Sequence, residues 1–186
     1  MNTIEAIAQR RSIRQFKSTP VPDELIVKIL NSTIQAPSGK NRQPWQFIVV
    51  KEDKRPEMIS IMRAGIDKVR KDGGNLGSSE RTTDVMEQAP VTIFIFNPYA
   101  ESVDGERTSN VVDTQSVGAA IQNMLLAAQE FGLGTLWICD VFYAYSELCA
   151  WLGQTHEMIA AVSLGYTDEQ PKARPRRPVD EVTVWF

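Results

Sequence analysis

The segment VTIFIF, residues 91–96, constrains the fold most, because it is β-branched or aromatic at every position. Pro90 and Pro98 bound it on both sides. A run of this composition between two prolines predicts a strand. The rest of the chain must then supply the remaining strands of a sheet and the helices that flank it.

Hydrophobic periodicity predicts these other elements along the chain. The predicted strands are residues 46–51, 135–139, 158–166 and the alternating C-terminal segment 181–186. A helix that starts at Pro22 should stop before Pro37, since a residue that precedes proline disfavours helical angles. The longest predicted helix is apolar on more than one side, which indicates heavy burial. The predicted helices are residues 3–10, 22–36, 58–69, 80–87, 110–131 and 143–152.

The order of these elements predicts one α+β domain over residues 1–186, with a central mixed β-sheet of four or five strands. Residues 168–186 should form an extended C-terminal arm, because residues 170–178 hold three prolines and four basic side chains. Val182, Val184, Trp185 and Phe186 follow, and exposure to water costs roughly 1.5–3 kcal/mol per large apolar side chain. We therefore expect the terminal strand to dock on a partner subunit.

Composition and missing motifs exclude several function classes. A net charge of −3 disfavours a general nucleic-acid binder, and no apolar run reaches the roughly 18 residues of a membrane span. The start of the chain lacks the apolar run of a secretory signal, so a cytoplasmic location is expected.

Cys139 and Cys149 fit no zinc or redox spacing, and Cys139 is expected to pack as a buried thiol. His156 is the single histidine, which rules out histidine-rich metal sites and disfavours a Ser–His–Asp hydrolase.

Two short segments concentrate the positive charge. Arg10, Arg11, Arg14 and Lys17 lie in one, and Lys172, Arg174, Arg176 and Arg177 lie in the other, which together make eight of the twenty Lys and Arg residues. In an extended segment Arg10, Ser12 and Arg14 share one face, because alternate residues point the same way. Guanidinium groups and a hydroxyl suit the oxygens of a phosphate, so one compact anion is the predicted ligand.

These segments, taken with their order, resemble the nitroreductase family. The resemblance rests on RRSIRQF (10–16), VPDELIVKIL (21–30), APSGKNRQPWQFIVV (36–50), GLGTLWI (132–138) and PKARPRRP (171–178). It implies a nitroreductase-like fold, a homodimer with FMN at the subunit interface, and an exchanged C-terminal arm and strand. It also implies no dedicated catalytic side chain, since the flavin N5 carries the reaction with NADH or NADPH as co-substrate.

The resemblance further implies which residues bind FMN. Arg10, Arg11, Ser12 and Arg14 would hold the phosphate and ribityl chain, together with Lys172 and Arg174. Pro37, Ser38 and Asn41 would approach from the other subunit. The isoalloxazine ring would lie along Leu136, Trp137, Ile138 and Cys139, although Trp45 and Trp137 are also interpreted as core residues. Asn75 or Arg81 would supply a further contact from the 73–81 segment.

The expected activity is that of an FMN-dependent oxidoreductase, which takes hydride from NAD(P)H and reduces nitroaromatic, quinone or similar acceptors by a ping-pong mechanism. Reductive dehalogenation, enoate reduction and flavin fragmentation on the same fold are alternatives, as is a non-enzymatic flavin-binding role. An RNA-binding role for the basic segments is disfavoured by the acidic balance of the chain. Two candidate lids, residues 63–80 and 98–109, are polar and do not indicate the acceptor.

Overall fold

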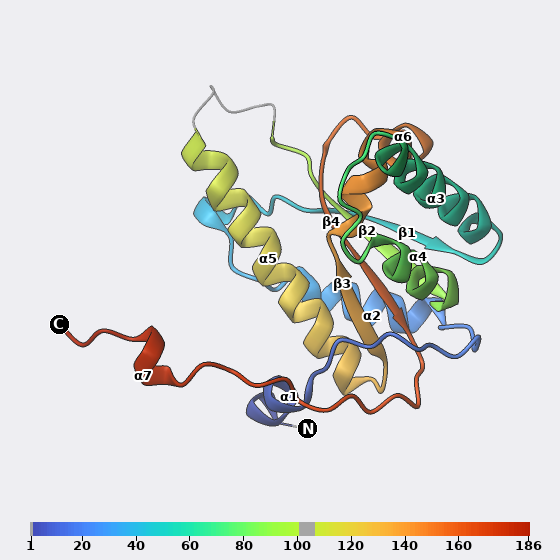
Figure 1. Cartoon of the computed structure of the whole chain (residues 1–186). Helices are drawn as coiled ribbons and strands as arrows, with labels where there is room; N and C mark the ends of the chain where they lie inside the picture. Colours follow the sequence, from blue (N-terminus) through green and yellow to red (C-terminus); the bar gives the residue numbers. More distant parts are fainter. Residues whose placement is uncertain (1, 101–106) are drawn as a thin grey trace.

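A computed structural model describes residues 2–100 and 107–186. Its centre is a four-stranded sheet in the order β1-β2-β4-β3 (Figure 1). The strands are β1 (Gln46–Lys51), β2 (Val91–Asn97), β3 (Gly134–Ile138) and β4 (Glu157–Gly165). All four were predicted from the sequence to within one or two residues, and the predicted α+β fold class is confirmed.

Helices cover both faces of this sheet. One face packs on α2 (Asp23–Thr33) and α5 (Arg107–Glu130), and the other on α3 (Arg55–Lys71), α4 (Ser79–Gln88) and α6 (Tyr145–Trp151). Two further helices, α1 (Thr3–Gln9) and α7 (Val179–Val182), lie near the ends of the chain. Short 3-10 helices span Gly39–Asn41, Glu52–Lys54 and Asp140–Ala144.

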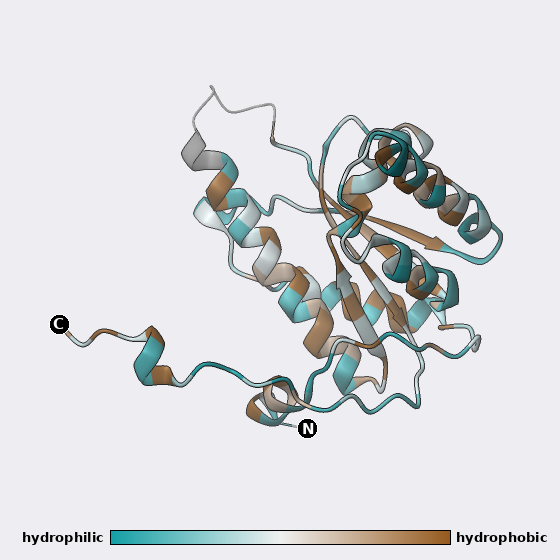
Figure 2. Ribbon diagram, viewed as in Figure 1, coloured by the Kyte–Doolittle hydropathy of each residue, from teal (hydrophilic) through white to brown (hydrophobic). Residues whose placement is uncertain are grey.

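Strand β2 lies at the centre of both hydrophobic cores. All seven residues of β2 are buried, with Phe94 and Phe96 in one hydrophobic cluster and Val91, Ile93 and Ile95 in the other. Figure 2 shows the apolar character concentrated on the inner strands. A strand covered by helices on both faces needs an apolar side chain at nearly every position, which explains why β2 shows no alternation.

Every pairing between the four strands is antiparallel, so the prediction of a mixed sheet is wrong for this chain. The single parallel contact in the described part of the chain is an isolated bridge between Ser12 and Thr135. Composition and order of elements do not set strand direction here, because every connection between consecutive strands contains a helix and is long enough for either direction. The bridge matters because it attaches the first basic segment to the edge strand β3.

The C-terminal strand predicted over residues 181–186 is also wrong for the single chain. Residues 179–182 form the short helix α7, and residues 183–186 have no strand partner. The arm runs away from the body of the domain in Figure 1. A strand needs a hydrogen-bonding neighbour, and an alternating pattern alone does not provide one. Val184 and Trp185 are 90% and 89% exposed in this arrangement.

Helix α5 is less enclosed than its composition predicts. Its buried stripe includes Val117, Ile121, Met124 and Ala128, which pack on the sheet. Gly132 ends the helix with φ +75°, and the Leu133 N–H donates to the Ala128 carbonyl at 2.8 Å, as in a Schellman cap. The flank with Val111 and Val112 is exposed, so residues 2–100 and 107–186 leave this apolar surface partly uncovered.

A matched pair of helical glycines gives a stability prediction. A Cβ on Gly65 of α3 would meet the Tyr143 carbonyl oxygen at 2.5 Å and the Ala144 Cβ at 2.6 Å. Gly65→Ala should therefore destabilise the domain by about 1–3 kcal/mol through overpacking, and lower Tm by roughly 5 °C. Gly118→Ala in α5 is the control, since its nearest neighbour would be Trp137 at 3.9 Å. We expect Gly118→Ala to hold or raise Tm in calorimetry; equal losses in both variants would contradict this packing explanation.

Candidate functional site

The first basic segment is fixed against β3 and against the start of the C-terminal arm. Arg10 is the C-cap of α1, where the chain turns to extended geometry. The Ile13 N–H then donates to the Thr135 carbonyl at 2.9 Å. Gly134 permits this approach, because a Cβ there would meet Ile13 Cγ1 at 2.7 Å. With Ile13 buried, Ser12 and Arg14 point the opposite way.

Glu169 joins the two basic segments across 155 residues of sequence. Its Oε2 accepts the backbone N–H groups of Arg14 at 2.6 Å and Gln15 at 3.0 Å. The Thr167 hydroxyl donates to the Gln15 carbonyl at 2.7 Å, and the Lys17 N–H donates to the Tyr166 carbonyl at 2.8 Å. These bonds place the arm beside residues 13–17, so Lys172 and Arg174 come next to Arg10 and Ser12.

The result is one cationic cavity of about 600 Å³. Glu169 is the one carboxylate among its lining residues, and its Oε2 is occupied by backbone donors. Ser12 contributes a hydroxyl. Seven cationic side chains line the cavity: Arg10, Arg11, Arg14, Arg81, Lys172, Arg174 and Arg176. A chain of net charge −3 thus gathers a strongly positive site, which is hereafter called the basic cavity.

The electrostatics of the basic cavity favour an anion. Burial lowers the pKa of Arg10, and the nearby positive charges of Arg176 and Arg11 lower it further. Repulsion among these positive charges raises the free energy of the cluster, and the lowered pKa of Arg10 reflects that repulsion together with burial. A phosphate dianion would relieve this repulsion and accept several charge-assisted hydrogen bonds.

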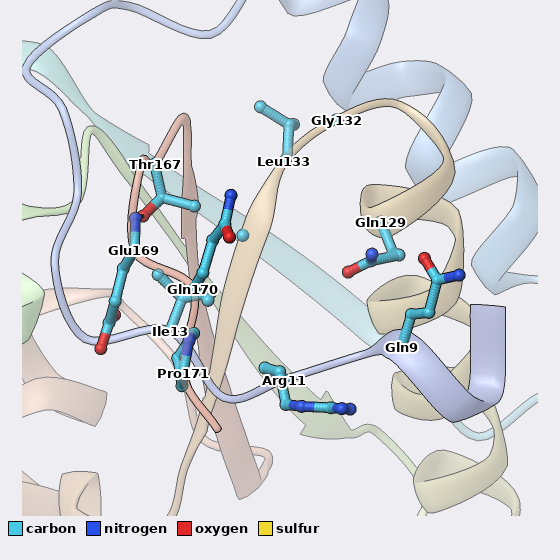
Figure 3. A pocket seen from close by; sticks show the side chains of 11 residues that line it. Gln9, Arg11, Ile13, Gln129, Gly132, Leu133, Thr167, Glu169, Gln170 and Pro171 are labelled. Atoms are coloured by element: carbon cyan, nitrogen blue, oxygen red, sulfur yellow. Dashed lines mark hydrogen bonds between the residues drawn. The ribbon is translucent and has the colours of Figure 1, made fainter. Parts of the chain in front are cut away.

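A second, smaller pocket of about 440 Å³ lies on the other side of the arginine segment. Figure 3 shows Gln9 and Gln129 on one side of it and Thr167 and Glu169 on the other. It shares Arg11, Glu169 and Pro171 with the basic cavity, but Arg11 is its one cationic lining residue. The charge of Glu169 balances that of Arg11, so phosphate chemistry belongs to the basic cavity.

The predicted ring-contact residues lie on β3 and alternate in orientation. Leu136 and Ile138 point into the core, at 6% and 2% exposure, whereas Trp137 is 39% exposed and Cys139 is exposed. The interpretations of Trp137 as core and of Cys139 as a buried thiol are therefore wrong. Trp45 packs half-buried against a hydrophobic cluster, as expected.

The edge strand β3 explains these exposed positions. It is the last strand of the sheet, so beyond the Ser12 bridge its outer edge has no neighbouring strand within the described residues. Its outward side chains and backbone groups are therefore accessible. Partial desolvation raises the pKa of the Cys139 thiol, and the neighbouring Asp140 charge raises it further, so the thiol stays protonated near neutral pH.

The predicted Pro37, Ser38 and Asn41 do not line the basic cavity. Their loop lies on the N-terminal half of α5, away from α1 in Figure 1. There the Gly39 N–H donates to Ser116 Oγ at 3.3 Å, and Arg42 donates twice to the buried carboxylate of Asp113, at 3.1 Å each. Within one chain the two groups of predicted ligands are separate.

This loop is held in an unfavourable backbone conformation. Lys40, Asn41 and Gln43 have φ of 52°, 54° and 51°, in the left-handed region that non-glycine residues rarely adopt. Such residues cost of order 1–3 kcal/mol each and concentrate at functional sites. The bidentate pair between Arg42 and Asp113 offsets part of this cost and holds the loop in one shape.

Of the two candidates in the 73–81 segment, Arg81 lines the basic cavity and Asn75 does not. Asn75 caps its own loop, with Oδ1 accepting the Gly77 N–H at 2.9 Å, and its carbonyl accepts the Tyr143 hydroxyl at 2.9 Å. Two residues of the site were not predicted from the sequence: Glu169, which joins the two basic segments, and Arg176, which lines the basic cavity. The prolyl basic run signalled Arg176 only as one cation among four.

The candidate lid at 63–80 comprises the C-terminal part of α3, the following loop and the start of α4. The second candidate, 98–109, falls mainly on residues outside the described part, which omits 101–106. In residues 2–100 and 107–186, no helix has the length and apolar character to cross a membrane. Nor do three His, Cys, Asp or Glu side chains gather as metal ligands in the same ranges.

Fold and site together define an α+β domain with an extended arm and a strongly cationic cavity beside the edge strand of its sheet. The family model named Nitroreductase matches residues 7–166. The chain belongs to the nitroreductase family, and the resemblance found in its motifs is confirmed.

Relatives and solved structures agree with this assignment. YfhC of Bacillus subtilis, whose name assigns it as an NAD(P)H nitroreductase, is 29% identical over 94% of this chain and 89% of its own length. Rat iodotyrosine deiodinase 1 is 32% identical over 71% of this chain, which spans only 50% of that protein. A nitroreductase structure from Desulfovibrio desulfuricans in complex with FMN has 30% identity and a TM-score of 0.80, and the match covers 100% of this chain and 98% of that one.

Proposed function

We propose that this protein is an FMN-dependent oxidoreductase that takes hydride from NAD(P)H and reduces electron-poor acceptors such as nitroaromatics or quinones. The observation that carries the proposal is the basic cavity, where two distant segments bring six cations and Ser12 together and Arg81 of α4 adds a seventh cation. The FMN complex of the Desulfovibrio relative and the name of the Bacillus relative support the choice of ligand and of co-substrate.

The guanidinium, ammonium and hydroxyl groups of the basic cavity suit the phosphate and ribityl oxygens of FMN. Arg10, Ser12, Arg14, Lys172 and Arg174 would hold the phosphate and ribityl chain, with Arg11 beside them. The segment from Leu136 to Cys139, in which Trp137 and Cys139 are exposed, would face the ring, with the Cys139 amide as a donor toward its reactive N5 edge. Arg81 would supply positive charge for the ring edge that becomes negative on reduction.

Bound FMN supplies the hydride-accepting and electron-donating chemistry that no side chain of this chain can supply. The protein holds and orients the cofactor and leaves one face of it open to both substrates in turn. Cys139 is not needed as a nucleophile, since its thiol stays protonated with a raised pKa. The site residues therefore act as binding and positioning groups.

We infer that the active form is a homodimer with the flavin at the subunit interface. Pro37, Ser38 and Asn41 lie away from the basic cavity of their own chain, so a second copy would have to bring them to the ring. Exposed apolar groups on α5 and on the arm, such as Val111 and Trp185, provide surface for that contact. Residues 1–186 would form one domain with 168–186 as an extended arm, of which the apolar end, residues 179–186, would dock on the partner subunit.

The proposal predicts a yellow protein whose flavin responds to nicotinamide nucleotides. Anaerobic mixing with NADH or NADPH should bleach the flavin absorbance, and a nitroaromatic or quinone should restore it in a second step. The measurement is stopped-flow absorbance on the purified dimer. A protein that stays colourless after incubation with FMN, or whose flavin neither nucleotide bleaches, would contradict the proposal.

A second candidate is reductive removal of halogen from an aromatic substrate. The 32% identity to rat iodotyrosine deiodinase 1 over 71% of this chain favours it. Anaerobic turnover of an iodinated tyrosine against a nitroaromatic separates the two. Iodide release faster than nitro reduction would favour dehalogenation.

A further inference from the structure

The basic cavity holds more positive charge than one FMN can neutralise. Of its eight charged lining side chains, seven are cationic and one is anionic. A phosphate monoester contributes about two negative charges near neutral pH, and a reduced flavin ring contributes about one more. About three positive charges then remain without an anion.

The proposed FMN contacts leave Arg11 and Arg176 as the lining cations without an assigned anion. Arg11 donates to the carbonyl oxygens of Ala8 at 2.7 Å and Arg10 at 2.9 Å, so its charge is held in place by backbone acceptors. Arg176 donates to the carbonyl oxygens of Arg174 and Pro175 at 3.3 Å each. Neither arginine forms an ion pair within residues 2–100 and 107–186, and Arg176 is exposed. An exposed guanidinium whose only partners are carbonyl oxygens can bind an anion without breaking an ion pair.

We propose that Arg176, with Arg11 beside it, binds a second phosphate group, the 2′-phosphate of NADPH, and so makes the enzyme prefer NADPH to NADH. The inference rests on the proposed function, in which a nicotinamide nucleotide reaches the bound flavin. NADPH and NADH differ only in this phosphate. A surplus cation next to the flavin phosphate therefore discriminates between them by charge alone.

The competing source of a second phosphate is the cofactor itself. FAD carries a diphosphate in place of the FMN monoester, and the same arginines could hold it. The cofactor released from the purified protein identifies this case by chromatography. FAD as the bound cofactor would overturn the inference, because the surplus charge would then be used by the flavin.

The test compares steady-state kinetics of the FMN-loaded protein with its Arg176→Gln variant. The unaltered protein should show a kcat/KM for NADPH about tenfold or more above that for NADH, as expected for a partly screened charge-assisted contact. Arg176→Gln should remove most of this preference by raising KM for NADPH about tenfold, while KM for NADH and the flavin content stay the same. Arg176→Lys should keep part of it.

Arg177→Gln is the matched control, because Arg177 is the next residue of the same arm but does not line the basic cavity. It removes an equal charge and should leave the preference intact. A direct binding measurement supplements the kinetics: calorimetry should show 2′,5′-ADP binding about tenfold tighter than 5′-AMP, a difference that Arg176→Gln abolishes.

The outcomes separate this inference from the proposed function. Yellow protein that both nucleotides reduce with equal kcat/KM would overturn the inference alone. Equal losses for both nucleotides in Arg176→Gln, or an equal loss of preference in Arg177→Gln, would do the same. Protein that neither holds FMN nor distinguishes 2′,5′-ADP from 5′-AMP would contradict both.

Discussion

A chain that ends at Gln170 should be a colourless monomer. The truncation removes Lys172, Arg174 and Arg176, which are three of the seven cations of the basic cavity. Each contact of a charged donor with a phosphate contributes about 1.5–3 kcal/mol, so the loss of the two proposed FMN ligands Lys172 and Arg174 should weaken FMN binding by roughly two to four orders of magnitude. Visible absorbance of the purified protein and titration with FMN measure this effect.

The same truncation should abolish dimerisation, because it removes the exposed apolar end of the arm. Val184 and Trp185 are almost fully exposed in the single chain, as is Phe186. Burial against a second copy would stabilise the dimer by roughly 1.5–3 kcal/mol for each such side chain. Light scattering coupled to gel filtration reports the oligomeric state.

A chain that ends at Pro178 separates the two effects. It keeps every cation of the basic cavity and loses only α7 and the apolar end, residues 179–186. We expect weaker dimerisation with measurable FMN affinity, in contrast to the complete loss on truncation at Gln170. A protein shortened to Gln170 that remains yellow and dimeric would contradict both the cavity assignment and the exchanged arm.

The fold was predictable where one physical requirement dominated. β2 is covered on both faces, so its sequence had to be apolar throughout, and composition alone identified it. Gly132 was predictable as a helix end because its φ of +75° favours glycine. The two basic segments were recognisable as one candidate anion site, and the structure brings six of their eight cations to the same cavity.

The remaining features depend on contacts that no local pattern records. The end of the chain alternates like a strand, yet without a neighbour it forms only one helical turn and an extended tail. Cys139 and Trp137 have apolar neighbours in sequence but lie on the outer edge of the last strand. Glu169 joins the basic segments through backbone donors 155 and 154 residues away, and a lone glutamate gives no signal of such a role.

Arg10→Ala should weaken FMN binding far more than Arg11→Ala does. The motif resemblance gives both arginines the same role, whereas strand alternation favours Arg10, Ser12 and Arg14. The contacts of the two side chains agree with strand alternation. Arg11 donates to the Ala8 and Arg10 carbonyl oxygens, while Arg10 lines the basic cavity with no side-chain hydrogen bond or ion pair in the described part of the chain.

A guanidinium that repels its neighbours gains most from an anion. Arg10 has a pKa lowered by burial and by Arg176 and Arg11, so a bound phosphate relieves both the desolvation and the repulsion. Loss of this contact should cost about 1.5–3 kcal/mol, or roughly ten- to 150-fold in Kd for FMN. For Arg11→Ala we expect less than about tenfold, together with a small loss of stability at the end of α1. Fluorescence titration of FMN decides the order, and equal losses in the two variants would favour the motif resemblance over strand alternation.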